Sequence, residues 1–313
     1  MRIFALTAAL AWTQMLALAG SAARVVFVRD QQIYTANEDG SDLRQLTKGG
    51  TWKKMPKWSP DGREIAYLTA GDMSVDPKSH AKIETISADG QHVATVPVLA
   101  TMADGTEVGG MRWVDSIGWF DDRHVFADGE GLNPHVGEFR TIDIATGKMG
   151  GFAEGGFESC PSKGRVAFFA PAFPPDTRLR LRVNVRGDDI DRFVIANWDK
   201  LPSIHVELRW TPDCKDAALV DAEPPAALVL VGAERGVRKV PLPDWPFENP
   251  ALSLVNGMLL IRSKSKALLF DFRGNAVTEA PPALLEQLDT ERVAREKVVQ
   301  ELKGQSPDWW PAP

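Results

Sequence analysis

The sequence predicts an all-β protein: a six-bladed β-propeller of four-stranded antiparallel blades, followed by a C-terminal α-helix. Three observations predict this fold. Short apolar runs alternate with tight-turn sequences, two kinds of turn recur along the chain, and 26 Gly and 22 Pro among 313 residues interrupt it too often for long helices. A propeller of this length forms a single domain, although length alone would suggest two.

The first kind of turn is clearest at residues 59–62, between two short strands. Pro60 presets a central φ angle of this turn, and Asp61-Gly62 supplies the remaining turn residues. Related turns precede five apolar strands, which are expected at residues 65–68, 124–126, 166–169, 217–220 and 258–261. An opening strand at residues 25–28 lacks such a turn before it.

The second kind of turn contains glycine and lies between the third and fourth strands of each predicted blade. It recurs as Asp39-Gly40, Asp89-Gly90, Thr146-Gly147, Arg186-Gly187, Arg235-Gly236 and Arg273-Gly274. The opening strand and the five strands that follow a tight turn make six strands, and the glycine turns also number six. These counts indicate six blades. Each blade then runs inner strand, tight turn, second strand, long loop, third strand, glycine turn and outer strand.

The segment 32–67 resembles a known family. Its Trp58-Ser59-Pro60-Asp61-Gly62 turn, the preceding Asp39-Gly40 turn and the strands between them are similar to the WD-like Pro-Asp repeat of the TolB family of periplasmic β-propellers. The resemblance covers about the first 70 residues and decays afterwards. It implies a propeller fold, which by itself does not assign a function.

Residues 1–23 have the pattern of a signal peptide. Arg2 gives a positive start, residues 3–18 are apolar and uncharged, and either 17–19 or 21–23 fits small-residue cleavage. The alternative, a retained membrane anchor, is disfavoured because the apolar stretch is short and contains polar residues. We therefore expect a periplasmic or secreted protein, with the propeller at 24–280 and no membrane span after cleavage.

Residues 281–313 are expected to form a helix and a tail. Pro281-Pro282 suits a first helical turn, residues 283–303 are rich in helix formers, and Gly304 suits a helix end. We expect the helix to pack on the rim of the propeller, where it shields the strand edge left in the first blade by its missing inner strand. Trp309-Trp310 would then anchor the tail, either on the propeller or on a partner.

Charge and cysteine content limit the function further. A net charge of −6 argues against nucleic acid as a partner. The two cysteines, Cys160 and Cys214, fall in corresponding turns of neighbouring blades. An oxidising compartment would allow them to form a disulfide, and the alternative is a pair of buried free thiols.

The longer loops of a propeller lie on one face, and we expect that face to bind the partner. The candidate contact residues there are Trp52, Lys53, Lys54, His135, Trp198, Trp245 and Phe247. Large aromatic side chains often anchor interfaces. The alternative for these aromatics is a structural role, packed against the next blade.

Other prominent residues are interpreted as structural. Trp58, Trp119 and Trp210 occupy equivalent turn positions and are expected to pack between blades, while Asp61 and Asp213 are expected to bond their own turns. The histidines show no metal-ligand spacing, so a metal shared by His80 and His135 with Asp76 or Glu130 is disfavoured. We expect no metal, cofactor or catalytic residue.

The sequence thus favours an exported, monomeric, non-enzymatic propeller that binds a protein or peptide of the cell envelope. Two alternatives stay open. One is a small-molecule or glycan-acting enzyme, of lyase or hydrolase type, that uses the mouth of the central channel. The other is a ligand sensor that uses the same site.

Overall fold

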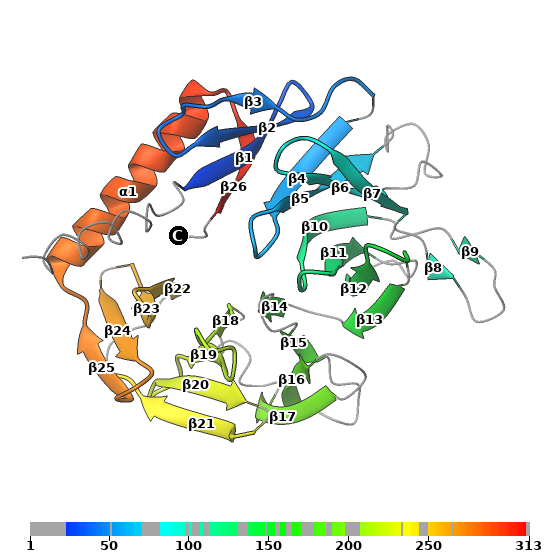
Figure 1. Ribbon diagram of the computed structural model, residues 1–313. Coiled ribbons are helices and arrows are strands. Elements are labelled where there is room, and N and C mark those ends of the chain that lie inside the picture. The colour runs from blue at the N-terminus through cyan, green and yellow to red at the C-terminus, as the bar shows by residue number, and fades with distance from the viewer. Residues whose placement is uncertain are drawn as a thin grey trace, which may run out of the picture.

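The computed structural model describes residues 23–50, 52–70, 82–97, 100–101, 107–108, 113–130, 137–147, 149–153, 157–160, 165–170, 178–185, 190–197, 207–232, 234–243, 250–264 and 266–310. These residues form antiparallel sheets and one long helix. The four-stranded sheets follow one another around a ring, with their first strands toward its centre (Figure 1). Within the part of the chain described here, six sheets have four strands each.

The first sheet combines both ends of the chain. Its strands, in spatial order, are β26 (Gln305–Trp310), β1 (Arg24–Arg29), β2 (Gln32–Asn37) and β3 (Arg44–Gln45). The C-terminal strand β26 pairs antiparallel with β1, so that Arg24 lies opposite Trp310 and Val28 opposite Gln305. The sequence analysis found no inner strand for the first blade and expected the helix to shield the exposed edge of the opening strand. Instead, β26 of the C-terminal tail is that inner strand, and it covers the edge of β1.

The other sheets are each built from consecutive strands. The second contains β4 (Trp52–Trp58), β5 (Glu64–Ala70), β6 (Lys82–Ser87) and β7 (His92–Pro97). The third contains β10 (Trp113–Trp119), β11 (His124–Glu130), β12 (Gly137–Asp143) and β13 (Met149–Ala153). Between them lies a two-stranded sheet of β8 (Ala100–Thr101) and β9 (Glu107–Val108).

The remaining three sheets complete the ring. The fourth contains β14 (Phe157–Cys160), β15 (Arg165–Ala170), β16 (Arg178–Val185) and β17 (Ile190–Asn197). The fifth contains β18 (Arg209–Trp210), β19 (Ala217–Asp221), β20 (Ala227–Gly232) and β21 (Gly236–Pro241). The sixth contains β22 (Ala251–Val255), β23 (Met258–Arg262), β24 (Ala267–Asp271) and β25 (Ala276–Glu279).

The predicted all-β content and the C-terminal helix are confirmed. Each of the five strands expected after a tight turn is a strand, as is the opening one. The helix α1 runs over Pro282–Glu301 and begins, as expected, at a proline. Its chain leaves the helix through Lys303, which has a left-handed φ of 53°.

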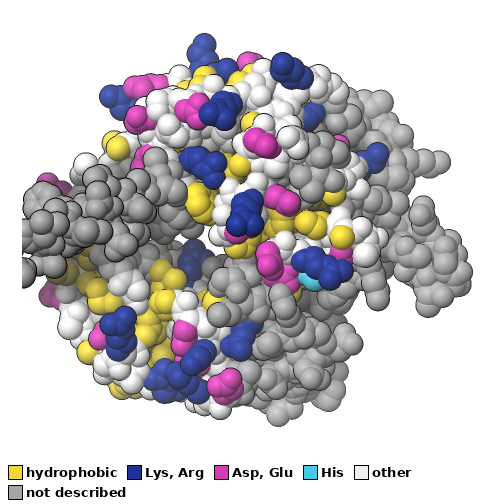
Figure 2. Space-filling model, in the orientation of Figure 1, with side chains coloured by type: hydrophobic (Ala, Val, Ile, Leu, Met, Phe, Trp, Pro, Cys, Tyr) yellow, Lys and Arg dark blue, Asp and Glu magenta, His cyan; other side chains and the backbone are white. Residues whose placement is uncertain are grey.

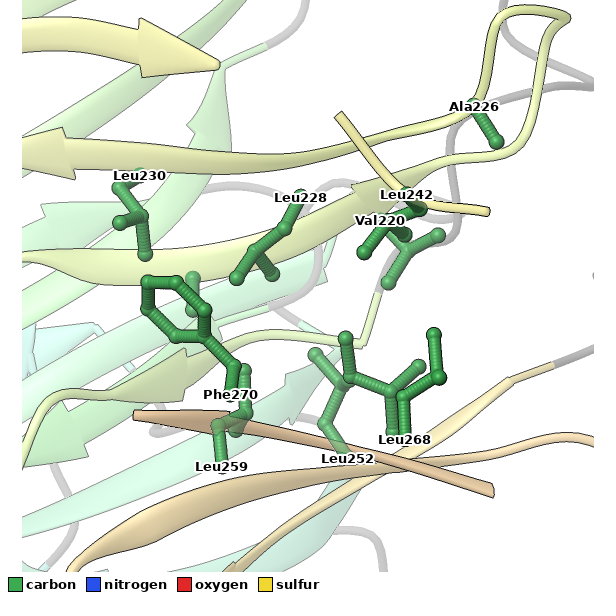
Figure 3. Packing of buried hydrophobic residues seen from close by; sticks show 11 residues of the cluster. Val220, Ala226, Leu228, Leu230, Leu242, Leu252, Leu259, Leu268 and Phe270 are labelled. Carbon is green, nitrogen blue, oxygen red and sulfur yellow. The ribbon is translucent and has the colours of Figure 1, made fainter. Parts of the chain in front are cut away.

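Neighbouring sheets pack through apolar faces. Between the fifth and sixth sheets, Leu228 and Leu230 of β20 face Leu268 and Phe270 of β24, and all four side chains are at most 2% exposed (Figure 3). Alternate residues of each strand point to opposite faces of its sheet. Strands buried on both sides are therefore almost wholly apolar, as in Ala227–Gly232.

The helix α1 lies between the sixth and first sheets, on the outer side of the ring (Figure 1). Its N-terminal half packs Leu284, Leu285 and Leu288 against the sixth sheet. Its C-terminal half packs Val299 against Val25 and Phe27 of the first sheet. The helix thus packs against both the last and the first sheet of the ring.

No helix among the residues described is long and apolar enough to cross a membrane.

The residues that the sequence assigned to packing and turns have those roles. Trp58, Trp119 and Trp210 are 6%, 3% and 3% exposed. Asp61 Oδ1 accepts hydrogen bonds from Ser59 Oγ at 2.7 Å and from the Arg63 backbone N–H at 3.0 Å. Asp213 makes the equivalent bonds to Thr211 Oγ1 and the Lys215 N–H. These aspartates therefore fix the tight turns.

The two cysteines meet across neighbouring sheets. Cys160 ends β14 of the fourth sheet, and Cys214 lies in the turn after β18 of the fifth sheet. The structure joins them by a disulfide with Cα atoms 6.2 Å apart, a separation within the range of such bonds. Arg165 donates a hydrogen bond to the Cys214 carbonyl at 2.7 Å, which adds a polar link between the two sheets.

Candidate functional site: a basic pocket between the first two sheets

Three of the predicted contact residues lie on a strand and not on a loop. The sequence placed Trp52, Lys53 and Lys54 in the connection between two blades, but β4 begins at Trp52. Their exposure differs: Trp52 is 52% exposed, Lys54 is exposed, and Lys53 is only 7% exposed. The Lys53 side chain is therefore buried, whereas Trp52 and Lys54 reach the surface.

A β-bulge explains this arrangement. In the pairing of β4 with β5, two residues, Met55 and Pro56, stand opposite one, so alternation shifts by one residue. Lys53 consequently points to the same buried side of the sheet as Pro56 and Trp58, while Trp52 and Lys54 point to the other. Met55 has a left-handed φ of 52°, consistent with a local distortion of the strand.

The buried Lys53 is held by the loop that precedes β4. Its Nζ donates a hydrogen bond to the Gly49 carbonyl at 3.0 Å. Gly49 and Gly50 have φ of +63° and +76°, which glycine adopts without strain, so the loop can fold back over the ammonium group. A charged side chain this deeply buried requires such polar partners.

These residues line a pocket of about 570 Å³ between the first and second sheets, which we call the basic pocket. Its walls are Val28, Arg29, Asp30, Gln31, Trp52, Lys53, Lys54, Met55, Lys303, Gln305 and Ser306. Three segments distant in sequence meet there: the β1–β2 turn, the start of β4, and the chain that enters β26. The pocket exists because β26 completes the first sheet beside β4.

Backbone geometry opens the pocket. A second bulge lies where β26 pairs with β1, with two residues of β26 opposite Phe27. The non-glycine residues with left-handed φ that line the pocket are Asp30, Gln31, Met55, Lys303 and Ser306. Such residues are uncommon, and they cluster at functional sites more often than elsewhere.

The charge of the pocket is strongly positive. It contains Arg29, Lys53, Lys54 and Lys303 but a single carboxylate, Asp30. Within the described chain, Arg29, Lys54 and Lys303 have no carboxylate within 4.0 Å. Lys54 instead lies 5.3 Å from the centre of the Trp52 ring, and Arg29 lies 4.2 Å from that of Tyr34, both as cation–π contacts.

Charges elsewhere are more balanced. On the face shown in Figure 2, Lys and Arg side chains lie among Asp and Glu side chains. Arg123 pairs with Asp143 at 2.6 Å, and Lys57 with Asp308 at 3.3 Å. A cavity lined by four cationic residues and one carboxylate is therefore a local feature in a chain whose net charge is −6.

The remaining predicted contact residues cannot be placed in this pocket. His135, Trp198, Trp245 and Phe247 lie outside the described residues. Arg29, Asp30, Gln31 and Lys303 were missed by the sequence analysis. Arg29-Asp30-Gln31 has the charged and amide residues that are typical of an ordinary turn, so it did not stand out. Lys303 is brought beside this turn only by the pairing of β26 with β1.

A second cavity, of about 740 Å³, lies between α1, β26 and the sixth sheet. Its apolar walls include Leu254, Leu288 and Trp309. Its charged side chains already have partners, as in the Arg292–Glu296 pair at 2.7 Å and the Arg295–Glu38 pair at 2.9 Å. We therefore assign it to the imperfect fit of a helix between two sheets.

No group of three or more His, Cys, Asp or Glu side chains that could hold a metal ion occurs in the described ranges. The closest polar cluster is at the β10–β11 turn, where His124 Nδ1 lies 2.9 Å from Asp121 Oδ1. Asp121 also accepts hydrogen bonds from the backbone N–H groups of Arg123 and His124. This cluster fixes a turn, like those at Asp61 and Asp213.

Similarity to known proteins is found among solved structures. No family profile and no curated protein matches the chain. Among solved structures, it is similar to the β-propeller domain of the Trilobed protease from Pyrococcus furiosus (12% identity, 79% of this chain, 73% of that chain, TM-score 0.49). It is also similar to TolB from Acinetobacter baumannii (13%, 92% and 66%, TM-score 0.42).

A third similar structure is the acylaminoacyl peptidase of Pyrococcus horikoshii (14% identity, 80% of this chain, TM-score 0.51), of which the chain spans 41%. At this identity, the likeness shows the fold alone.

Proposed function

We propose that this chain is an exported, non-enzymatic, monomeric propeller with six blades, which binds a protein or peptide partner of the cell envelope through the basic pocket. In this proposal residues 1–23 are a signal peptide, residues 24–280 carry the blades, and residues 281–313 carry α1 and the strand that closes the first blade. The observation that carries the proposal is the half-exposed Trp52 at a cavity whose wall also contains the exposed Lys54 and Lys303.

Three properties of this site support recognition of a peptide. Aromatic side chains with a free face are preferred anchors at protein interfaces. A cavity of about 570 Å³ falls within the usual size range of binding pockets. The walls combine apolar surface from Val28 and Met55 with polar groups, as binding sites usually do.

The proposal is tested with Trp52→Ala. The full mature chain is used to capture partners from envelope extract of the native host, with cross-linking to retain weak complexes. We expect a partner that is bound by the wild type and lost by at least tenfold in Trp52→Ala, since a central aromatic contributes about 2 kcal/mol or more. Leu43→Ala is the matched control because Leu43 is also an exposed large apolar residue, at 42%, outside the pocket.

Two results would contradict the proposal. One is capture that is equal for the wild type, Trp52→Ala and Leu43→Ala. The other is a purified wild-type protein that captures no partner while turning over a small-molecule or glycan substrate.

Export is tested separately. We expect the protein isolated from its host to begin near Arg24 and to be recovered from the periplasmic or secreted fraction. Mass spectrometry of the intact protein measures this directly. A protein that retains Met1 would contradict the signal-peptide proposal without affecting the binding site.

A further inference from the structure

We propose that the second cavity, between α1, β26 and the sixth sheet, binds a single acyl chain with an uncharged head group, as in a monoacylglycerol. Its volume of about 740 Å³ falls within the usual range of ligand pockets. No residue that lines it also lines the basic pocket. The inference therefore concerns a separate site and does not rest on the proposed function.

The first argument is the apolar surface that the imperfect fit of α1 leaves uncovered. Between the fifth and sixth sheets, the apolar side chains of β20 and β24 pack directly against each other (Figure 3). Between the sixth and first sheets, α1 takes this place and packs at its two ends, through Leu284 and Val299. Between these contacts the cavity keeps half-buried apolar walls from Leu254, Val255 and Trp309. An apolar ligand would remove this surface from water.

The second argument is the shape of the cavity. The residues of α1 that line it recur every three or four positions from Leu284 through Leu288 to Gln300. Residues at this spacing lie on one face of a helix. The cavity therefore follows most of the helix, over about 24 Å at 1.5 Å per residue. An elongated cavity suits an extended chain better than a compact ring system.

The third argument is the charge of the wall. Two cations and two carboxylates line the cavity, so their charges balance. Arg292 pairs with Glu296 at 2.7 Å, and Arg295 pairs with Glu38 at 2.9 Å. Glu291 accepts a hydrogen bond at 2.9 Å from a glutamine of the preceding helical turn. A charged head group would therefore meet no excess of opposite charge.

The same bonds favour an acyl chain over a peptide. The backbone N–H and C=O groups of a buried peptide need hydrogen-bond partners. The charged side chains of this wall are already bonded to other groups of the protein. An acyl chain has no polar group along its length, so it can fill the cavity without breaking these bonds.

The experiment measures binding of saturated monoacylglycerols, whose chains lengthen by two methylene groups at a time, to the full mature chain. Calorimetry is carried out below the concentrations at which the lipids form micelles, at low and at physiological ionic strength. A fatty acid with the longest chain of the series tests the charge of the head group. Gln287→Trp places an indole at an exposed position of the cavity wall, and Glu286→Trp changes the adjacent exposed residue, which does not line it.

We expect the affinity of the wild type to rise about fourfold for each added methylene group and to be insensitive to salt. Gln287→Trp should weaken binding about tenfold or more, because its ring displaces roughly two methylene groups from the cavity. Glu286→Trp should bind like the wild type, and the fatty acid should bind no more tightly than the monoacylglycerol of equal chain length. Melting temperatures without lipid check that both variants fold, and the chain-length series on the wild type does not depend on either variant.

Four outcomes would overturn this inference: no binding of any lipid, an affinity that does not change with chain length, equal effects of the two tryptophan substitutions, and tighter binding of the fatty acid. None of them bears on capture of a partner through Trp52. If the monoacylglycerols bind as expected but Trp52→Ala captures partners like the wild type, the acyl-chain site stands and the proposed function fails.

Discussion

Gly62 and Gly236 have nearly the same left-handed backbone, with φ of +68° and +65°, but different surroundings. A Cβ atom at Gly62 would collide with the indole of Trp310, whereas one at Gly236 would meet nothing within 4 Å. We expect Gly236→Ala to lower the free energy of unfolding by about 1 kcal/mol, the backbone cost alone. Gly62→Ala should lower it by about 2 to 5 kcal/mol, because Trp310 must also move.

Denaturant unfolding of the two variants measures this difference. Trp310 is the last residue of β26, so a displaced indole should also change the tryptophan fluorescence of the folded state. Equal destabilisation by the two substitutions would contradict the close packing of Trp310 on the second sheet.

Two aspartates should give opposite dependences of stability on pH. Burial raises the pKa of Asp308, against the opposing influence of Lys57 and of the hydrogen bond from the Trp58 backbone N–H. The hydrogen bonds from Arg262 lower the pKa of Asp289 below its ordinary value, although partial burial opposes them. One group thus favours the protonated form in the folded protein, and the other favours the ionised form.

The sign follows from proton linkage. The contribution of Asp308 is fully present below its unfolded pKa and is lost as the pH rises through its higher folded pKa. The contribution of Asp289 is present above its unfolded pKa and is lost as the pH falls through its lower folded pKa. We therefore expect the stability difference between wild type and Asp308→Asn to decrease above about pH 4, and that for Asp289→Asn to decrease below it.

Urea unfolding of wild type and each Asn variant at several pH values measures these slopes. Asp289 and Arg262 are 41% and 44% exposed, so solvent screening should keep the effect of Asp289 on stability small. Parallel pH profiles for the wild type and Asp308→Asn would contradict the burial of that carboxyl group.

At the scale of elements, β26 is the strand on which the first sheet depends. We expect truncation after Leu302, which removes β26 but keeps α1, to lower the melting temperature strongly and to promote aggregation. It exposes the edge of β1 and removes two partly buried tryptophans, each of which contributes about 3 kcal/mol or more. Truncation after Trp310 is the matched control and should leave stability unchanged.

Thermal unfolding and light scattering distinguish the two truncations. A chain ending at Leu302 that melts like the full chain would show that β26 is not needed to hold the ring together.

The sequence predicted some elements well because their turns have specific chemistry. Pro60, Asp61 and Gly62 are a combination that strongly favours a tight turn, so the strand that follows this turn could be predicted. β26 was not found, because Gln305–Trp310 contains a proline and charged or polar residues and no apolar alternation. It becomes a strand through pairing with β1, which lies at the other end of the chain and cannot be inferred from local pattern.

The candidate site was predicted only in part for the same reason. Trp52 stood out as a large aromatic residue outside the repeated turns, and it is exposed at the pocket. Lys53 is buried because β4 already begins at Trp52, whereas the sequence analysis placed residue 53 on a connecting loop. Arg29 and Lys303 join the site only when β26 and β1 are paired.

At the scale of the whole molecule, the Cys160–Cys214 disulfide links the fourth and fifth sheets across 54 residues of sequence. We predict that this bond forms in the exported protein. Reduction should then lower the free energy of unfolding by up to about 4 kcal/mol through chain entropy. The double variant Cys160→Ser/Cys214→Ser is the control, whose stability should not respond to reductant. Alkylation of two thiols in the unreduced, denatured protein would contradict the bond.

The pairing of β26 with β1 also sets an order of events in time. Residues 24–29 leave the ribosome well before residues 305–310. β1 therefore has no inner partner until residues 305–310 have been made, and the first sheet forms late. Late completion of the first sheet also delays the formation of the basic pocket, because Lys303, Gln305 and Ser306 belong to its wall.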